Sequence, residues 1–138
     1  MGLAIFDLDN TLLGGDSDYL WGRFLCEQGV VDAAVYEREN ERYYQAYQAG
    51  TLDIMEFLAF ALRPLARHDR ATLDGWHRQY MQAKVLPMIT PAARALVEQH
   101  RARGDTPVII TATNRFVTAP IAARFGIAHL IATEVEMD

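Results

Sequence analysis

The distribution of hydrophobic and polar residues along the chain predicts short buried strands separated by amphipathic helices. Short apolar runs at residues 3–8 and 107–111 have the length and composition of buried parallel strands, and residues 129–135 are predicted to form a third strand. Helical periodicity extends from about residue 17 to residue 85, and a further helix begins at Thr90-Pro91. The order strand, helical block, helix, strand, helix, strand predicts an α/β fold with a right-handed parallel sheet.

The long helical region between the first two strands is predicted to form a separate subdomain. The connection between the first strand and the Thr90 helix, about 70 residues, is too long for a simple crossover. We therefore predict a helical subdomain, residues 15–85, inserted into an α/β core of residues 1–14 and 86–138. The expected helices run from Asp16 or Ser17 to Gly29, from Asp32 to Gly50, from Leu52 or Asp53 to about Pro64, from about Ala71 to Lys84, from Thr90 to Arg103, and from Asn114 or Thr118 to Phe125-Gly126.

The composition is that of a soluble globular protein and excludes several classes of function. The chain is 51% hydrophobic and 22% charged, and its net charge is -5. Without a basic patch we expect no nucleic-acid partner, and without a long apolar run we expect no membrane span, so a cytoplasmic location is the default. The single cysteine, Cys26, excludes a disulfide framework and is interpreted as a small apolar residue on a helix.

Polar residues gather where the first two predicted strands end. Asp7 and Asp9 are separated by one residue and are followed by a turn-forming Asn10. Because alternate residues of a strand share a face, the two carboxylates can point the same way. Thr111 and the backbone N–H of Ala112 follow the second strand, and ligands of parallel sheets bind beyond the carboxyl ends of the strands. These groups together suggest phosphoryl transfer assisted by Mg²⁺.

The charge of a phosphate monoester explains why a metal is expected. A carboxylate about 4 Å from each phosphate charge is repelled by roughly 4 kcal/mol at an effective dielectric constant of about 20. Mg²⁺ cancels this repulsion and accepts one or two carboxylates together with phosphate oxygens and water. We predict that Asp7 attacks phosphorus and forms an aspartyl-phosphate, and that Asp9 acts as general acid and base. Thr111, the Ala112 N–H and Asn10 are expected to bind the phosphate.

Two segments carry a resemblance to a known family. Ile5–Leu13 resembles the first motif of the haloacid dehalogenase superfamily of phosphohydrolases, and Val108–Thr111 resembles its second motif. The inserted helices resemble the cap of those enzymes. Residues 16–21, 111–116 and 131–134 look most like the phosphoserine-phosphatase-like branch. Members of that branch hydrolyse small phosphomonoesters such as phosphoserine or histidinol phosphate.

The resemblance implies a Rossmann-like core sheet and assigns roles to individual residues. Asp7 becomes the nucleophile, Asp9 the acid/base and Thr111 a phosphate ligand. Mg²⁺ would be held by Asp7 and the main-chain carbonyl of Asp9. The residues expected near the rest of the substrate are Asp16, Asp18, Asn114 and Arg115, although capping a helix is an equally good interpretation of the two aspartates.

The family also has a third motif with a lysine and a fourth with acidic residues, both C-terminal to the second motif. The single lysine, Lys84, lies upstream of Thr111, and the late acidic residues Glu134, Glu136 and Asp138 lie in or after the third strand. We therefore expect the chain to correspond to the first part of such an enzyme, with the C-terminal part of the core missing. The first strand would then have an unpaired edge, which favours self-association.

Other functions remain open at this point. The main alternative is a catalytically silent module that binds phosphate or a partner, because half of the family's site is not found. A receiver-type phospho-acceptor fits poorly, since its acceptor aspartate follows a later strand and no helical insert interrupts it. A sugar-nucleotide transferase fits poorly too, because only six residues precede Asp7. For the phosphatase interpretation, the expected partner is a small phosphomonoester.

Overall fold

The chain divides into two compact units. The computed structural model describes residues 2–134. One unit contains the residues up to Gly22 together with those from His77 onward and carries the sheet, and Arg23–Trp76 form a helical unit. The boundaries expected from the sequence, residues 15 and 85, both fall within the first unit. That residues 15–85 act as a cap subdomain stays a prediction.

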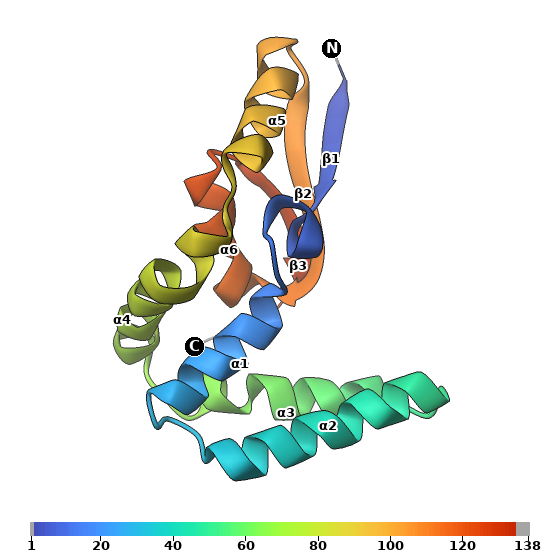
Figure 1. The fold of residues 1–138 in the computed structure, drawn as a ribbon, viewed down its shortest axis with the longest axis vertical. Helices are drawn as coiled ribbons and strands as arrows, with labels where there is room; N and C mark the ends of the chain where they lie inside the picture. Colours follow the sequence, from blue (N-terminus) through green and yellow to red (C-terminus); the bar gives the residue numbers. More distant parts are fainter. Residues whose placement is uncertain (1, 135–138) are drawn as a thin grey trace. The chain divides into compact units, whose positions relative to one another are not determined.

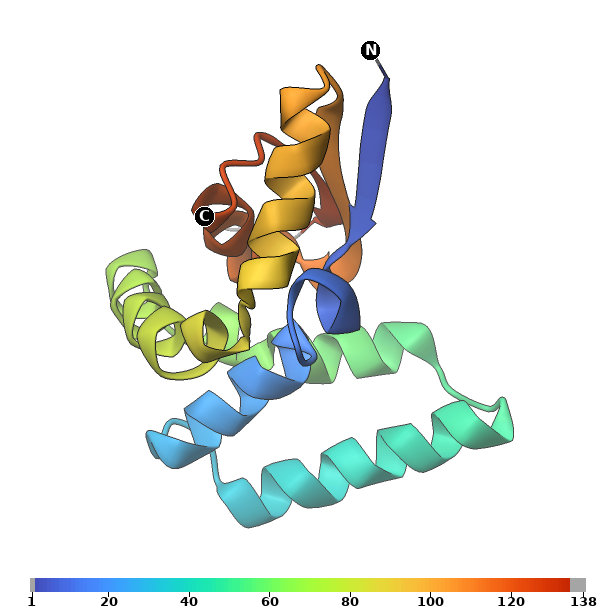
Figure 2. The same cartoon turned by 45° about the horizontal axis from the view of Figure 1, so that its top comes forward.

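Three parallel strands form the sheet, in the order β1-β2-β3. The strands are β1 (Leu3–Asp7), β2 (Thr106–Asn114) and β3 (His129–Thr133). The helices α5 (Pro91–Ala102) and α6 (Arg115–Arg124) lie on the same side of the strands, as right-handed crossovers in one direction require (Figures 1 and 2). The predicted α/β class with a parallel sheet is confirmed.

Only one face of this sheet is covered by the described residues. Ala4 and Phe6 are buried under the helices, whereas Leu3 and Ile5 are 69% and 60% exposed. Ile131 of β3, on the other side of β2, is 57% exposed as well. The prediction of a continuously buried first strand was therefore wrong. Because strand side chains alternate between faces, helices on one side bury every second residue and leave the others to solvent.

Both helices of the α/β unit begin at side-chain caps. The Thr90 hydroxyl accepts the Ala93 N–H at 3.1 Å, which confirms the predicted start of α5. The Asn114 side chain accepts the Val117 N–H at 3.0 Å and caps α6, so Asn114 and not Thr118 begins that helix. Each cap satisfies a backbone donor that the first helical turn leaves unpaired.

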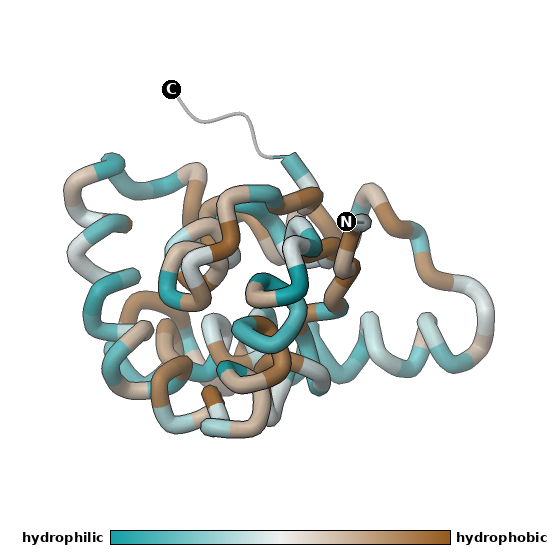
Figure 3. The backbone as a smooth tube through the Cα atoms, turned by 90° about the horizontal axis from the view of Figure 1, so that it is seen from above, coloured by the Kyte–Doolittle hydropathy of each residue, from teal (hydrophilic) through white to brown (hydrophobic). Residues whose placement is uncertain are grey.

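The helical segments have the expected caps with slightly different bounds. Asp32 and Asp53 accept backbone N–H groups at the starts of two helices, and Gly50 ends one of them with a φ of 74°. Hydrophobic and hydrophilic stretches alternate along these segments, as amphipathic packing requires (Figure 3). The elements are α1 (Ser17–Glu27), α2 (Ala33–Ala49), α3 (Ile54–Ala66) and α4 (Arg70–Tyr80), followed by a π turn at Met81–Val85 and a 3-10 turn at Leu86–Met88.

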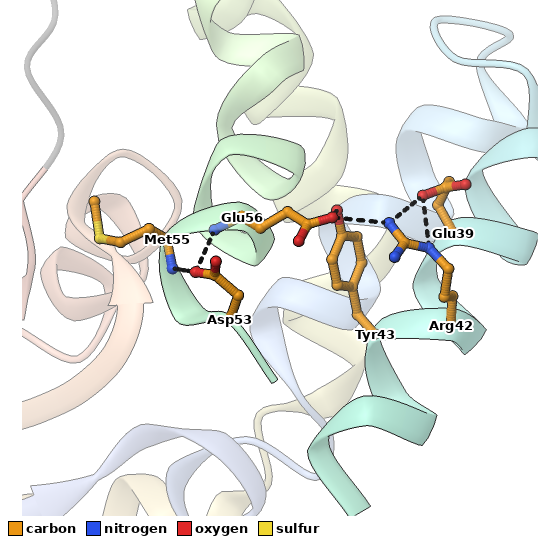
Figure 4. Close-up of polar contacts among 6 residues, drawn as sticks. All are labelled: Glu39, Arg42, Tyr43, Asp53, Met55 and Glu56. Atoms are coloured by element: carbon orange, nitrogen blue, oxygen red, sulfur yellow. Dashed lines mark hydrogen bonds and ion pairs between the residues drawn. The ribbon is translucent and has the colours of Figure 1, made fainter. Parts of the chain in front are cut away.

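Polar and aromatic contacts join α2 to α3 within the helical unit. The Tyr43 hydroxyl and the Arg42 guanidinium both donate to Oε1 of Glu56, at 3.3 Å and 3.1 Å (Figure 4). The ring of Tyr43 also packs against Phe57 and Phe60, with centroids 5.6 Å and 5.1 Å away. Because exposed ion pairs contribute only about 0–1 kcal/mol, the buried rings supply most of the stabilisation.

Candidate active site

The first predicted site residue, Asp7, is the last residue of β1. It is in register with Ile110 of β2, and Thr111 follows Ile110 directly. Asp7 and Thr111 therefore lie at adjacent strand ends, as the sequence predicted. The Asp7 side chain is exposed and makes no hydrogen bond or ion pair with any residue from 2 to 134. A carboxylate in this setting is available to a ligand.

A tight turn follows β1 and returns the chain towards the sheet. It spans Leu8–Leu12 and is closed by the Leu13 N–H, which donates to the Leu8 carbonyl at 3.0 Å. Asn10 has a φ of 59°, a left-handed conformation that asparagine tolerates better than most residues. Its N–H donates to the Gly15 carbonyl at 3.0 Å. The turn places Asp9 and the start of α1 close together.

Both carboxylate oxygens of Asp9 accept hydrogen bonds. Oδ1 accepts the backbone N–H of Ser17 at 2.7 Å, and Oδ2 accepts the Thr113 hydroxyl at 3.1 Å. The Ser17 hydroxyl in turn donates to Oγ1 of Thr113 at 3.1 Å, and both hydroxyl residues are buried. Asp9 is thus held by α1 on one side and by the end of β2 on the other.

The end of β2 departs from regular strand geometry at the predicted phosphate site. Between Ile110 and Asn114, four steps along β2 match two steps along β3. The Thr111 hydroxyl accepts the Thr113 N–H at 3.1 Å within this bulge. The carbonyl of Ala112 accepts the Thr133 hydroxyl at 2.6 Å. Bulges of this kind redirect side chains beside active sites, and here one brings Thr113 to Asp9.

The two aspartates at the start of α1 have different surroundings. Asp16 accepts the Tyr19 N–H at 2.9 Å and caps the helix, the second of the two interpretations offered by the sequence. Asp18 is half-buried, and its carboxylate makes no hydrogen bond or ion pair within the described part of the chain. Burial, followed by the charges of Asp16 and Asp9, raises the pKa of Asp18 to about 6.

A buried tyrosine supports the start of α1. The Tyr80 hydroxyl donates to the Ser17 carbonyl at 2.8 Å, and its ring packs edge-on against Trp21 at 5.0 Å. Burial and the nearby carboxylates raise the pKa of Tyr80 well above its ordinary value, so the phenol stays protonated. The sequence identified Tyr80 only as a core position and Ser17 only as a cap, and it missed Thr113. Thr113 lies two residues beyond Thr111, a strand spacing that could have signalled it.

Asn114 and Arg115 make structural contacts. The Asn114 carboxamide oxygen caps α6, and the Arg115 guanidinium binds the Glu134 carboxylate at 2.8 Å and the Leu130 carbonyl at 2.9 Å. Arg115 thereby ties the start of α6 to β3. The expected contact of these two residues with the leaving group is not supported by these bonds and stays a prediction.

The residues present match part of a magnesium site. The free carboxylate of Asp7 and the main-chain carbonyl of Asp9 would supply two oxygen ligands, since the Asp9 carboxylate is already engaged by two donors. Among residues 2–134, no three His, Cys, Asp or Glu side chains gather as a metal cluster. Mg²⁺ commonly takes only one or two protein carboxylates, with phosphate and water completing its shell. The described residues therefore fit part of the protein side of such a site.

A comparison with protein families decides the relationship. The model of the haloacid dehalogenase-like hydrolases matches residues 4–138. The chain belongs to this family. The resemblance inferred from Ile5–Leu13 and Val108–Thr111 is confirmed. None of the helices within residues 2–134 of this haloacid dehalogenase-like chain is long and apolar enough to cross a bilayer.

The chain is similar to individual proteins of known sequence or structure. The chain is 46% identical over 134 residues to a protein named histidinol-phosphatase from Neisseria meningitidis serogroup C (strain 8013), covering 97% of this chain and 60% of that protein. A protein with unknown function from Bordetella pertussis Tohama I is 44% identical, with a TM-score of 0.91 over 98% of this chain and 61% of that structure. A phosphoserine phosphohydrolase-like protein from Francisella tularensis subsp. tularensis SCHU S4 shares the fold, with a TM-score of 0.68 at 17% identity over 100% of this chain and 61% of that one. The haloacid dehalogenase-like chain thus spans about three fifths of these relatives.

Proposed function

We propose that this chain supplies the nucleophile, the acid/base and part of the phosphate site of a Mg²⁺-dependent phosphomonoester hydrolase. The substrate would be a small phosphorylated metabolite resembling phosphoserine or histidinol phosphate. The relative named histidinol-phosphatase, 46% identical over nearly the whole chain, supports this substrate class. The observation that carries the proposal is the free carboxylate of Asp7 at a strand end, next to an Asp9 held by Ser17 and Thr113.

The first chemical step transfers the phosphoryl group to Asp7. A carboxylate oxygen of Asp7 attacks phosphorus, and the bond from phosphorus to the ester oxygen breaks. Protonated Asp9 gives its proton to the departing alkoxide, which leaves as the alcohol. Thr111, the Ala112 N–H and Asn10 bind the phosphate oxygens in this scheme.

The second step regenerates the enzyme. Water attacks phosphorus of the aspartyl-phosphate, Asp9 accepts a proton from that water, and the bond between phosphorus and Asp7 breaks to release inorganic phosphate. General acid and base assistance of this kind contributes about 10²–10⁴-fold each. Mg²⁺ bound at Asp7 and the Asp9 carbonyl would offset the repulsion between the carboxylate and the phosphate.

The test is hydrolysis of an aryl phosphate with and without Mg²⁺, with Asp7→Asn as the decisive variant. Asp53→Asn is the matched control, because Asp53 caps α3 and asparagine caps helices equally well. We expect activity that requires Mg²⁺, disappears in Asp7→Asn and survives in Asp53→Asn. Folding of every variant is checked by circular dichroism. Equal activity in Asp7→Asn would exclude Asp7 as the nucleophile.

A silent phosphate-binding module is the second candidate. The lack of a three-residue metal cluster within residues 2–134 favours it. It predicts that the folded chain binds phosphate in the presence of Mg²⁺ without turnover. The hydrolysis assay and a phosphate titration by calorimetry are made on the same preparation. Turnover supports the phosphatase, whereas phosphate binding without turnover supports the module.

A further inference from the structure

A second candidate site lies entirely within the helical unit. An open cavity of about 250 Å³ is lined by the segment that follows α1, the first turn of α2, the last turns of α3 and the two residues after α3. Its wall combines apolar and cationic side chains, chiefly Val35, Tyr36, Phe60, Pro64, Arg63 and Arg67. None of these residues takes part in the phosphate chemistry proposed above.

Helical spacing explains how the cavity is built. Arg63 and Pro64 lie three and four residues after Phe60, so the three residues share one face of α3, and Arg67, the C-cap residue, lies three residues after Pro64. The rings of Tyr36 and Phe60 approach to 5.1 Å with an interplanar angle of 31°. Phe60 and Pro64 are buried, whereas the two arginines are exposed. The cavity therefore has an apolar floor and a cationic rim.

The arginines at this rim are unpaired. Neither the Arg63 nor the Arg67 guanidinium makes a hydrogen bond or ion pair with any described residue. Three other arginines of the unit are paired, Arg23 with Glu37, Arg42 with Glu39 and Glu56, and Arg70 with Asp74. The Arg38 guanidinium, like those of Arg63 and Arg67, has no partner among the described residues, but Arg38 does not line the cavity. A local excess of positive charge in a chain of net charge -5 points to an anionic ligand.

A single carboxylate among the lining residues reduces this excess without cancelling it. Asp32 accepts the Val35 N–H at 3.1 Å as the cap of α2. Two guanidinium groups against one carboxylate leave a net positive rim. His68, also in the wall, packs edge-on against Trp76 at 4.7 Å.

We propose that this cavity binds a small organic anion with an apolar body. Its carboxylate would lie between Arg63 and Arg67, because guanidinium groups bind carboxylates through paired charge-assisted hydrogen bonds. Its ring or branched chain would cover Tyr36, Phe60 and Pro64. The volume is below the roughly 300–1,000 Å³ of sites for drug-sized ligands, which restricts the ligand to about one ring and its side chain.

The test uses 3-phenylpropionate as the probe and methyl NMR of the full chain as the readout. Val30, Val31 and Val35 line the cavity and report on it, while Val97 and Val117 lie buried in the α/β unit and serve as internal controls. We expect saturable shifts of the three reporter valines with a Kd of the order of 1 mM. The uncharged 3-phenylpropanamide should bind at least about tenfold more weakly, because it lacks the charge that the arginines recognise.

Matched variants test the role of the arginines. Arg63→Gln/Arg67→Gln should weaken the probe at least about tenfold, whereas Arg38→Gln/Arg78→Gln, which removes two exposed cations outside the cavity, should leave Kd within about twofold. Unchanged valine methyls at about 10 mM probe would overturn the proposal. Equal affinity for the amide, or shifts confined to Ile5 and Ile131 of the sheet, would overturn it as well. The readout is binding, so the result is independent of phosphatase activity.

Discussion

The hydroxyl of Thr113 lies 3.1 Å from Oδ2 of Asp9 and joins the end of β2 to the turn after β1. The same hydroxyl accepts a hydrogen bond from Ser17 at 3.1 Å. Because a hydroxyl has one donor and two acceptor positions, Thr113 can donate to ionised Asp9 and can accept from protonated Asp9 after rotation. It is therefore suited to hold Asp9 in both protonation states that the proposed mechanism needs.

Thr113→Val should lower kcat by about 10–100-fold and leave KM for an aryl phosphate within about threefold, because the change affects the proton-transferring group more than substrate binding. Thr113→Ser keeps the hydroxyl and should recover most of the activity. Thr106→Val, at the start of β2, is the control for a threonine replaced in the same strand. If Thr113→Ser were as impaired as Thr113→Val, the hydroxyl would not be the functional group.

The raised pKa of Asp18 predicts a pH-dependent cost to stability. The native carboxyl holds its proton up to pH about 6, while the unfolded one releases it near 3.8. Between these values the native state binds more protons, so this group lowers the free energy of unfolding as pH rises from about 4 to about 6. Asp18→Asn should remove the penalty and stabilise the protein by about 1–3 kcal/mol at pH 7.5, with no difference at pH 3.5.

Urea denaturation of Asp18→Asn and the parent chain, in EDTA, measures this difference at several pH values. The difference between the two curves isolates the effect of Asp18 from that of carboxyls such as Asp105. The hydrogen bond with His100 lowers the pKa of Asp105, so ionisation of Asp105 raises the free energy of unfolding as pH rises. Asp53→Asn serves as a control, because asparagine retains the cap of α3 and Asp53 is not among the charges that raise the pKa of Asp18. A constant difference across the pH range would contradict the assignment.

Asn114 offers a direct choice between a structural and a substrate-binding role. Asn114→Ala removes the cap of α6 and should destabilise the protein by about 1–2 kcal/mol, whereas Asn114→Asp keeps an oxygen acceptor and should cost much less. Thermal unfolding gives both values. If Asn114 acts through the cap alone, kcat/KM of the aspartate variant stays near the parent value. A large loss of kcat/KM with normal stability would restore its predicted contact with the leaving group.

The sequence predicted those features that depend on local geometry. Thr90-Pro91, Asp32 and Asp53 begin helices as their side chains suggested, because a cap is decided within three or four residues. Asp7 and Thr111 could be placed at adjacent strand ends because parallel strands align their carboxyl ends. Strand and helix order thus followed from the pattern of apolar residues.

Features that depend on distant neighbours could not be read from the pattern. Leu3 and Ile5 were expected to be buried, yet their exposure depends on which helices cover the sheet. The contact of Thr113 with Asp9 requires a bulge of two residues in β2. The spacing of apolar residues along the sequence does not indicate this bulge. Tyr80 has the spacing of a core residue, so its hydrogen bond to Ser17 became visible only in the structure.

The exposed sheet predicts that this 138-residue chain associates with itself. β1 has no partner on its outer edge among the described strands, and the exposed side chains of Leu3 and Ile5 on β1 and of Ile131 on β3 contribute to an apolar face of the sheet. Unpaired apolar edges and patches promote pairing between molecules. Sedimentation at tens of micromolar should show dimers or larger species, and Ile5→Lys should shift the protein to monomer because a buried lysine cannot be accommodated in such an interface. Ile54→Lys, at a similarly exposed isoleucine of α3, should leave the distribution unchanged. A monomeric parent chain, or an equal response to both substitutions, would show that the sheet does not mediate association.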